Sequence, residues 1–414
     1  MSHNRAASAM TVSASDPDLF ARTRQAFDLP AGVIYLDGNS LGPLPHAARE
    51  RVRRETDEHW GCDLIRAWNS AGWMELPTRV GGRIAPLIGA PTGSIVAGDS
   101  TSINLFKALA AALSLAPPDR HVILSDRGNF PTDLYIAEAI AKLLGRGHRL
   151  ETVAPDGVEH ALDDRVAVLM LTQVDFATGR LHDMASLTAR AQALGVITVW
   201  DLAHSAGALP IDLTAAGADF AVGCGYKYFN GGPGAPAFIY TKPSLADRVE
   251  PALAGWMGHA APFLFEQGYR PAAGTERMRA GTPPILSMAA LDAALDVFDG
   301  IDMHAVRARS IELSELFIAE VEARCPALAL VSPCDPRQRG SQVSFQFADG
   351  YALMQALIDD GVIGDFRAPD IVRFGFAPLY ISHDDVREAA VRLERIMRSR
   401  SWEQPRFQAR QRVT

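Results

Sequence analysis

The stretch Val199–Tyr240, VWDLAHSAGALPIDLTAAGADFAVGCGYKYFNGGPGAPAFIY, decides the fold of this chain. An apolar run over residues 196–200 ends in Asp201, and a second run over residues 220–222 leads into Lys227. Two short apolar strands separated by a turn and a short helical piece are typical of a crossover between parallel strands. In open α/β sheets, functional groups gather just beyond the carboxyl ends of the strands. We therefore expect Asp201 and Lys227 at one edge of a parallel sheet.

Asp201 and Lys227 together offer the chemistry that a pyridoxal-phosphate site needs. A lysine amine reacts with the aldehyde of this cofactor, and a carboxylate keeps its pyridine nitrogen protonated. Taken singly, each residue has an ordinary explanation, because a lysine after a strand is usually a solvated charge and an aspartate there usually caps a helix. His204 lies close in sequence to Asp201, and glycines around Lys227 let the backbone approach a ligand, so the joint pattern favours the cofactor site.

The same block resembles kynureninase, a pyridoxal-phosphate enzyme of the aspartate-aminotransferase-like fold group. The resemblance rests on WDLAHSAG and GYKYFNGGPGAPAFIY, and it continues in YLDGNSLGPLP, NFPTD, GTPPILS and VRFGFAPLY, in order over residues 31–400. Any one motif alone is weak, whereas the ordered set is specific. It implies an α/β fold, in which a large domain holds a mainly parallel, doubly wound sheet and a smaller C-terminal domain is α+β.

Strands and helices alternate along the chain, as a doubly wound sheet requires. We expect an N-terminal arm and helix over 1–30, a large cofactor-binding domain over 31–285, a small C-terminal domain over 286–400, and a polar tail over 401–414. Residues 1–14 are expected to be disordered. The predicted strands cover residues 95–97, 121–125, 166–172, 196–200, 220–222, 238–240, 341–347 (half-buried, from its alternation), 362–366 and 371–376. The predicted helices cover residues 16–27, 46–59, 79–88, 103–115, 134–144, 184–194, 285–298, 303–324, 351–360 and 384–398.

Composition excludes several classes of protein. The 414 residues carry 40 Lys plus Arg against 48 Asp plus Glu, and a net charge of −8 argues against a nucleic-acid surface. No apolar run approaches the roughly 20 residues that span a membrane, and the first 30 residues show no secretory signal. The four cysteines are scattered without metal-binding spacing. We expect a cytoplasmic protein with no metal, nucleic-acid or membrane partner.

The resemblance also implies which side chains hold the cofactor. Thr101 and Ser102 open an apolar helix, where free N–H groups favour a phosphate, although an ordinary N-cap also fits this turn. Phe130 would stack on the cationic ring. His204 could hydrogen-bond Asp201 and orient it, or serve as a buried structural histidine. The further implied contacts are Pro131, Thr132, Asp133, Thr172, Asp201, Tyr226 and Lys227, with Trp256 and Thr282 reaching the phosphate from a neighbouring subunit.

Lys227 and Tyr226 are the implied catalytic residues. Burial would lower the pKa of Lys227 so that it acts as a base. Tyr226 would donate to the phosphate and relay a proton, although a packing role also fits it. Arg373 in VRFGFAPLY is the implied partner of the substrate α-carboxylate, because a guanidinium can bind a carboxylate through two parallel bonds. The other implied substrate contacts are Asn39, Ser40 and, as an aromatic wall, Trp68; Trp60 and Trp73 are expected in the core.

The family reaction is hydrolysis of the Cβ–Cγ bond of L-kynurenine to anthranilate and L-alanine, in tryptophan degradation through the kynurenine pathway. 3-Hydroxy-L-kynurenine would give 3-hydroxyanthranilate, and the sequence does not choose between the two substrates. The bond cleavage rests on the resemblance only. Three alternatives are a class V aminotransferase, a cysteine desulfurase-like enzyme and a non-catalytic relative. A desulfurase needs a mobile nucleophilic cysteine, and neither Cys62 nor Cys224 suits that role. By analogy, we expect a homodimer with active sites at its interface.

Overall fold

A seven-stranded sheet forms the centre of the molecule, with strand order β2-β8-β7-β6-β5-β3-β4. The computed structural model describes residues 19–410. The strands are β2 (Ile95–Ala97), β3 (Val122–Asp126), β4 (Arg149–Val153), β5 (Val166–Thr172), β6 (Ile197–Asp201), β7 (Phe220–Cys224) and β8 (Ala237–Thr241). From β4 to β7 all neighbours pair in parallel, which confirms the predicted mainly parallel α/β sheet.

The direction of β8 and the presence of β4 were not predicted. β8 runs antiparallel to both β7 and β2. The chain reverses through the glycine-rich residues 231–234, since an antiparallel return needs only a loop, whereas a parallel one needs a crossover. Lys227 therefore lies in the turn that directly follows β7. Strand β4 stands at the sheet edge and is only partly buried, so its sequence RLETV carries a weak apolar signal.

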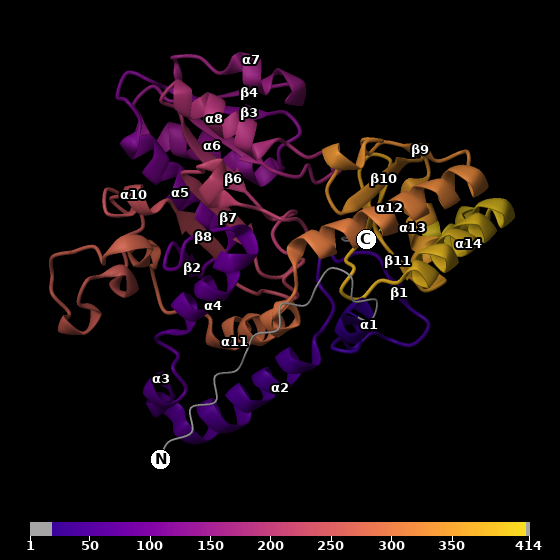
Figure 1. Ribbon diagram of the computed structural model, residues 1–414, viewed down its shortest axis with the longest axis horizontal. Coiled ribbons are helices and arrows are strands. Elements are labelled where there is room, and N and C mark those ends of the chain that lie inside the picture. The colour runs from indigo at the N-terminus through magenta and orange to yellow at the C-terminus, as the bar shows by residue number, and fades with distance from the viewer. Residues whose placement is uncertain (1–18, 411–414) are drawn as a thin grey trace.

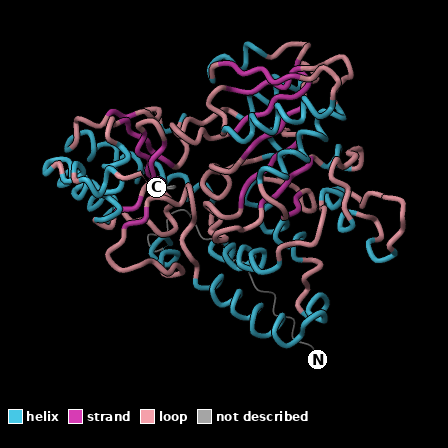
Figure 2. Tube along the Cα trace, turned by 180° about the vertical axis from the view of Figure 1, so that it is seen from behind, coloured by secondary structure: helices cyan, strands magenta, loops and turns pink. Residues whose placement is uncertain are grey.

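Helices cover both faces of this sheet (Figure 1). Successive residues of β5 alternate between two apolar clusters: Val168 and Met170 pack with helices α5 (Thr101–Leu115) and α6 (Pro131–Leu144), while Leu169 and Leu171 join the larger cluster on the other face. A strand buried on both faces must be apolar at every position, which explains the run VAVLMLT. Figure 2 shows the magenta strands enclosed by cyan helices from behind.

A second, four-stranded sheet lies in the C-terminal part, with order β12-β13-β10-β9 and antiparallel pairing throughout. Its strands are β9 (Ala329–Leu330), β10 (Gln342–Gln346), β12 (Asp365–Arg367) and β13 (Ile371–Gly375). The helices α12 (Met303–Arg324), α13 (Gly350–Asp359) and α14 (His383–Ser399) belong to the same part (Figure 1). The prediction of a half-buried β10 is wrong, because its polar face also packs against protein: Ser344 Oγ donates to Ala177 O at 2.6 Å.

The N-terminal segment packs on this C-terminal part (Figure 1). β1 (Ile34–Tyr35) pairs in parallel with β11 (Val362–Ile363), and Gly375 N donates to Leu36 O at 2.7 Å. The loop over residues 37–42 consequently lies against the end of β13. This contact brings Asn39 and Ser40 to the same place as Arg373.

The predicted helices are confirmed with shifted ends. Helix α2 (His46–Arg54) continues as a π-helix over Glu55–Asp63, and α4 (Leu76–Ile84) continues as a 3-10 turn to Ile88 before Gly89 at φ +58°. The predicted helix over 16–27 forms only as α1 (Leu19–Arg24) within the described part; the expectations for residues 1–14, for the start of that helix and for 411–414 lie outside it. The remaining helices are α3 (Ala67–Ser70), α7 (Val158–Ala161), α8 (Met184–Ala193), α9 (Leu213–Ala216), α10 (Pro243–Ala246), α11 (Ile285–Ala294) and α15 (Pro405–Gln408).

The division of the chain at residues 285 and 400 stays a prediction. Between residues 19 and 410, no helix is long and apolar enough to cross a lipid bilayer. All four cysteines are free thiols.

Candidate active site

A chain of hydrogen bonds leads from Lys227 into the C-terminal sheet. Lys227 Nζ lies 2.9 Å from His204 Nε2, and His204 Nδ1 lies 3.2 Å from Gln342 Oε1. The Gln342 amide nitrogen donates to Asp175 O at 3.2 Å and to Phe176 O at 3.0 Å, which turns its oxygen toward the histidine. Because an amide oxygen only accepts, Nδ1 of His204 carries the proton and Nε2 offers its lone pair to Lys227.

Electrostatics favour the uncharged forms of Lys227 and His204. Burial is the largest cause that lowers the pKa of each, and the positive charges of Arg373 and Arg367 lower both further. Asp201 opposes this effect on Lys227. A lowered pKa makes the free amine of Lys227 easier to form, and the free amine is the form that reacts with an aldehyde or accepts a proton.

The predicted hydrogen bond from His204 to Asp201 is wrong, since both ring nitrogens of His204 bond elsewhere. Asp201 Oδ1 instead accepts from Ala203 N at 2.8 Å, and its carboxyl lies near that of Asp133. Burial raises the pKa of both carboxyls, and repulsion from Asp201 raises the pKa of Asp133 further. Thr172 lies beside Asp201 on the neighbouring strand and donates to Asp133 Oδ2 at 3.3 Å. Two buried carboxyls in contact would stabilise a cation at this point, such as a protonated ring nitrogen.

The N-terminus of α5 fits a phosphate group. Ser100 is the N-cap and accepts from Ile103 N at 3.3 Å, so the ordinary cap also exists. The Thr101 hydroxyl is buried and has no hydrogen-bond partner among the described residues. First-turn N–H groups lack partners within a helix. Thr101 and Ser102 thus present donors that an anion would satisfy, and the donor set around Lys227 and Asp201 fits pyridoxal phosphate as a whole.

Phe130 begins helix α6 as its N-cap, with Pro131 at the first helical position and Thr132 following it. Its ring is 40% exposed and stands edge-on to Phe176, with centroids 5.2 Å apart. Asp133, one turn into the helix, is buried. An exposed aromatic face at this sheet edge suits stacking against a flat ring.

Arg373 lies on β13 and is fully buried. It stands opposite Asp365 in the β12–β13 register and donates to both carboxylate oxygens, with Nε 2.8 Å from Oδ1. Its Nη2 also donates to Ser40 Oγ at 2.9 Å. Asn39, with its amide oxygen turned toward Arg373, accepts from Nε at 2.9 Å. The structure therefore brings together Arg373, Asn39 and Ser40, the three residues that the sequence predicts to contact the substrate.

Three expected site residues do not join this cluster within one chain. Trp68 packs edge-on against Trp73, with ring centroids 5.7 Å apart. Trp256 is 39% exposed and packs against Phe263, and Thr282 is exposed. The segment that carries Trp256 projects from the large sheet beyond α10 (Figure 1).

Trp73 and Trp60 were both expected in the core, and only one of them is buried. Trp73 is in the core as predicted and donates to Glu55 Oε2 at 2.9 Å. Trp60 is 57% exposed, so its core assignment is wrong. The π-helical turn over Glu55–Asp63 rotates Trp60 away from the interior, which the residue types alone did not indicate.

Sequence reasoning missed Gln342, Asp365 and Arg367. Gln342 was assigned to a half-exposed strand, so its burial was not expected. Asp365 and Arg367 are spaced two apart beside a strand that carries Arg373, and that spacing places them on one face of a strand. The period of two was therefore a signal that could have found them.

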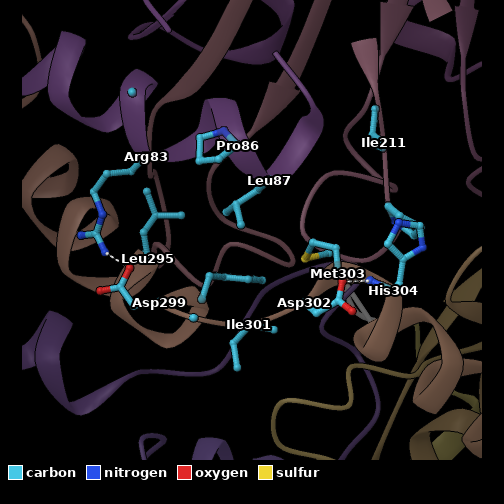
Figure 3. A pocket seen from close by; sticks show the side chains of 14 residues that line it. Arg83, Pro86, Leu87, Ile211, Leu295, Asp299, Ile301, Asp302, Met303 and His304 are labelled. Atoms are coloured by element: carbon cyan, nitrogen blue, oxygen red, sulfur yellow. Dashed lines mark hydrogen bonds and ion pairs between the residues drawn. The ribbon is translucent and has the colours of Figure 1, made fainter. Parts of the chain in front are cut away.

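A cavity of about 620 Å³ lies away from these residues, between α4, the residues after α11 and the start of α12 (Figure 3). Arg83 on its wall is paired with Asp299 at 3.1 Å. None of the residues that contact Lys227 lines it. Among residues 19–410, no group of three or more His, Cys, Asp and Glu side chains could hold a metal ion.

The chain is similar in sequence to known proteins over almost its whole length. The family described as Kynureninase C-terminal domain matches residues 306–393. The chain is 51% identical over 403 residues to the kynureninase of Pseudomonas fluorescens, covering 96% of this chain and 97% of that protein. It is 51% identical over 387 residues to the kynureninase of Deinococcus radiodurans, covering 92% and 94%.

Solved structures show the same fold at lower identity. A cysteine desulfurase from Thermococcus onnurineus superposes with a TM-score of 0.77 at 20% identity, covering 92% of this chain and 98% of that one. A C-DES variant with glycine covalently linked to its PLP cofactor superposes with a TM-score of 0.77 at 20% identity, covering 90% and 98%. These likenesses confirm the predicted fold class.

Proposed function

The chain belongs to the kynureninase family of pyridoxal-phosphate-dependent enzymes, and we propose that the cluster around Lys227 is the site at which it hydrolyses L-kynurenine to anthranilate and L-alanine. The observation that carries this assignment of the site is the bond between Lys227 and a neutral His204, beside the buried carboxyls of Asp201 and Asp133. The amine of Lys227 follows β7, while Asp201 ends β6 and Asp133 lies on α6, so the site separates the two kinds of charge that the chemistry needs.

Each side of the cluster has its own part in holding the cofactor. Asp201 would face the ring nitrogen, with Asp133 and Thr172 supporting it. Thr101 and Ser102 would bind the phosphate at the N-terminus of α5, and Tyr226 would donate to it. Phe130, at the start of α6 with Pro131 and Thr132, would stack on the ring, while His204 would lie beside Lys227.

Pyridoxal phosphate, when bound, supplies an aldehyde that reacts with amines and a ring that accepts electrons from the substrate α-carbon. Lys227 then needs to take up and return a proton at that carbon, and its lowered pKa keeps Nζ able to accept. Burial raises the pKa of Tyr226, so its phenol stays protonated and can donate. Lys227 Nζ lies 5.8 Å from the centre of the Tyr226 ring, close enough for the two to act on one substrate.

The α-carboxylate of the substrate would bind at Arg373, with Asn39 and Ser40 closing the pocket from the N-terminal loop. Trp68 would contribute an aromatic wall for the substrate ring. Hydrolysis of 3-hydroxy-L-kynurenine by the same site is part of this proposal, and a direct comparison of kcat/KM for the two substrates decides their order.

The proposed assembly is a homodimer in which Trp256 and Thr282 of one copy reach the phosphate site of the other. In a single chain both residues are exposed or half-exposed and lie outside the cluster, which supports a contact made by a second copy. A cytoplasmic location is proposed as well, since the four free thiols suit a reducing compartment.

The test is to incubate the holoenzyme with L-kynurenine and to follow anthranilate fluorescence and alanine together. Equal amounts of both products support the proposal, and Lys227→Ala should abolish them. Lys142→Ala, which removes an exposed lysine on α6, is the matched control and should keep full activity. Cofactor binding without anthranilate would leave the fold and Lys227 in place but overturn the substrate, and amino donors with keto acids would then be screened.

A further inference from the structure

A buried ion pair lies close to the N-terminus of α5, and the steps derived so far give it no part. Lys107, on the second turn of α5, is 3% exposed. Its Nζ donates to Asp99 Oδ2 at 2.7 Å and to Met278 O at 2.7 Å. Burial lowers the pKa of Lys107, and the charge of Asp99 opposes this effect. Burying an ammonium group costs free energy, and here its charge is matched by the carboxylate of Asp99.

Asp99 lies next to the residues proposed to bind the phosphate. It precedes Thr101 by two positions, so the Cα atoms of these residues are at most about 7.6 Å apart. Its backbone has φ +53°, a left-handed conformation that aspartate tolerates better than most residues. Ala237 N donates to Asp99 O at 3.0 Å, and Gly98 N donates to Ala237 O at 2.8 Å. These bonds to β8 fix the turn that carries the carboxylate, so Asp99 stays beside the start of α5.

A free carboxylate at this place would oppose the binding of a phosphate. The start of a helix attracts one anion through its open N–H groups and its dipole, and a second anion nearby is repelled by the first. In the part of the chain that the structure describes, Lys107 is the one cation paired with Asp99. Arg279, which lines the same small cavity of about 30 Å³, pairs instead with Glu276 at 3.1 Å. The neutralisation of Asp99 therefore depends on Lys107.

We propose that Lys107 is a positioning residue for the cofactor, which neutralises Asp99 so that the N-terminus of α5 can accept the phosphate. Lys107 acts through Asp99 and needs no contact with the cofactor itself. The bond to Met278 O holds Nζ in place without adding a second negative charge. This inference rests on the proposed function, which places the phosphate at Thr101 and Ser102, and it adds a residue that this placement did not include.

The experiment titrates the apoprotein with pyridoxal phosphate and, separately, with pyridoxal, which has the same aldehyde and ring but no phosphate. Lys107→Met removes the charge and keeps a side chain of similar length. We expect the Kd of pyridoxal phosphate to rise about tenfold, because the phosphate then meets an unpaired carboxylate. The Kd of pyridoxal should stay the same.

The double variant Asp99→Asn, Lys107→Met separates the effect of charge from a change of shape. Without the carboxylate there is nothing left to neutralise, so the Kd of pyridoxal phosphate should return to within about threefold of the wild type. A distorted start of α5 would also weaken binding of the phosphate, but removal of the Asp99 charge would not reverse that loss.

Lys242→Met is the matched control. Lys242 Nζ also donates to a backbone carbonyl, Gly217 O at 3.0 Å, and pairs with a carboxylate, Asp219 at 3.4 Å, but at the opposite end of the sheet. This variant should bind both ligands as the wild type does. Circular dichroism shows that each variant is folded, and Lys107→Gln, which keeps an N–H donor without a charge, gives the same comparison if Lys107→Met does not fold.

The outcomes separate this inference from the proposed function. An unchanged Kd of pyridoxal phosphate in the folded Lys107 variant, an equal loss for both ligands, or a loss that Asp99→Asn does not reverse overturns the inference alone. Thr101→Val in the same titration tests where the phosphate binds. Normal binding of pyridoxal phosphate by Thr101→Val would overturn the proposed phosphate site, and this inference with it.

Discussion

The side-chain amide of Gln342 sets the tautomer of His204. Its oxygen accepts from His204 Nδ1, and its nitrogen donates to two backbone carbonyls, which fix the orientation of the amide. We predict that Gln342→Leu lowers kcat/KM about tenfold, because His204 loses the acceptor that keeps its Nε2 free for Lys227. We also expect the pH profile to change in shape, which lost packing alone would not cause. Gln346→Leu on the same strand is the control: the Gln346 side chain is exposed and donates to Asp370 Oδ2 at 2.7 Å, away from His204, so the pH profile of this variant should match the wild type. Identical profiles for both variants would contradict the role of Gln342.

Asp37 makes the stability of the protein depend on pH near neutrality. Burial, and then repulsion from Asp365, raise the pKa of Asp37 from 3.8 to about 7, although Ser40, Arg373 and Arg367 oppose the rise. Between these two values the folded state holds a proton that the unfolded state has lost. Its stabilising contribution is therefore complete below about pH 4 and disappears as the pH rises to about 7.

Asp37→Asn cannot ionise, so we predict that its stability relative to the wild type increases from pH 4 to pH 7, by on the order of a few kcal/mol, and is constant above that range. Urea denaturation across this range measures the difference. For the control Asp164→Asn, which changes an exposed carboxyl, the difference in stability from the wild type should not change with pH. If the stability of Asp37→Asn also differs from that of the wild type by the same amount at every pH, the raised pKa of Asp37 is contradicted.

The Thr101 hydroxyl gives a test of the phosphate site that needs no turnover. Because it has no partner in the described structure, Thr101→Val should leave the stability of the apoprotein within about 0.5 kcal/mol. The same change should weaken cofactor binding about tenfold, as one hydrogen bond to a phosphate is lost. Titration of the apoprotein with pyridoxal phosphate measures this. Thr241→Val is closely matched, because that hydroxyl is also buried and unpartnered but lies at the opposite end of the sheet, and it should bind the cofactor normally.

At the scale of elements, β13 and the N-terminal loop make a close contact beside the proposed substrate site. A Cβ at Gly375 would lie 2.1 Å from the side-chain amide of Asn39. We predict that Gly375→Ala moves the loop, raises KM for L-kynurenine about tenfold and destabilises the protein by about 1–3 kcal/mol. Gly82→Ala, where a Cβ meets nothing within 4 Å, should leave KM unchanged. Steady-state kinetics and thermal denaturation of both variants measure these effects, and an unchanged KM for Gly375→Ala would contradict the prediction.

Strands that are buried on both faces could be predicted from the sequence. Features that depend on contact with a distant part of the chain could not. The runs at β5 and β7 are apolar at nearly every position, so any chain with these residues must bury them. The direction of β8 depends on a loop reversal, and the burial of Gln342 depends on a turn more than 160 positions away in sequence. Neither leaves a local pattern in the residues concerned.

The site shows the same division. Asp201 and Lys227 were identified because both directly follow strands, and Arg373 was identified through its motif. The bond from His204 to Lys227 was not foreseen, since which of two neighbours a buried histidine contacts depends on side-chain geometry. Arg367 was missed because no motif drew attention to it, although its spacing from Asp365 placed it on the correct face of β12.

At the scale of the whole molecule, the proposed homodimer with shared active sites predicts complementation between two defective variants. Lys227→Ala lacks the amine, and the double variant Trp256→Ala, Thr282→Ala lacks the contacts proposed to come from the second copy. After the two are mixed under conditions that exchange subunits, half of the dimers are hybrid and each has one intact site, so activity should return to about a quarter of the wild type. Activity that stays at the level of the separate variants would place Trp256 and Thr282 in their own subunit's site.

The pairing of β1 with β11 has a consequence for synthesis of the protein on the ribosome. The groups proposed to face the cofactor, from Thr101 to Lys227, are all translated before the C-terminal sheet exists. Asn39 and Ser40 emerge still earlier, yet they have no Arg373 to lie against until β13 has left the exit tunnel. A nascent chain therefore holds its own groups proposed for the cofactor long before those proposed for the substrate can meet, and it could not select a substrate until almost the whole chain has been made.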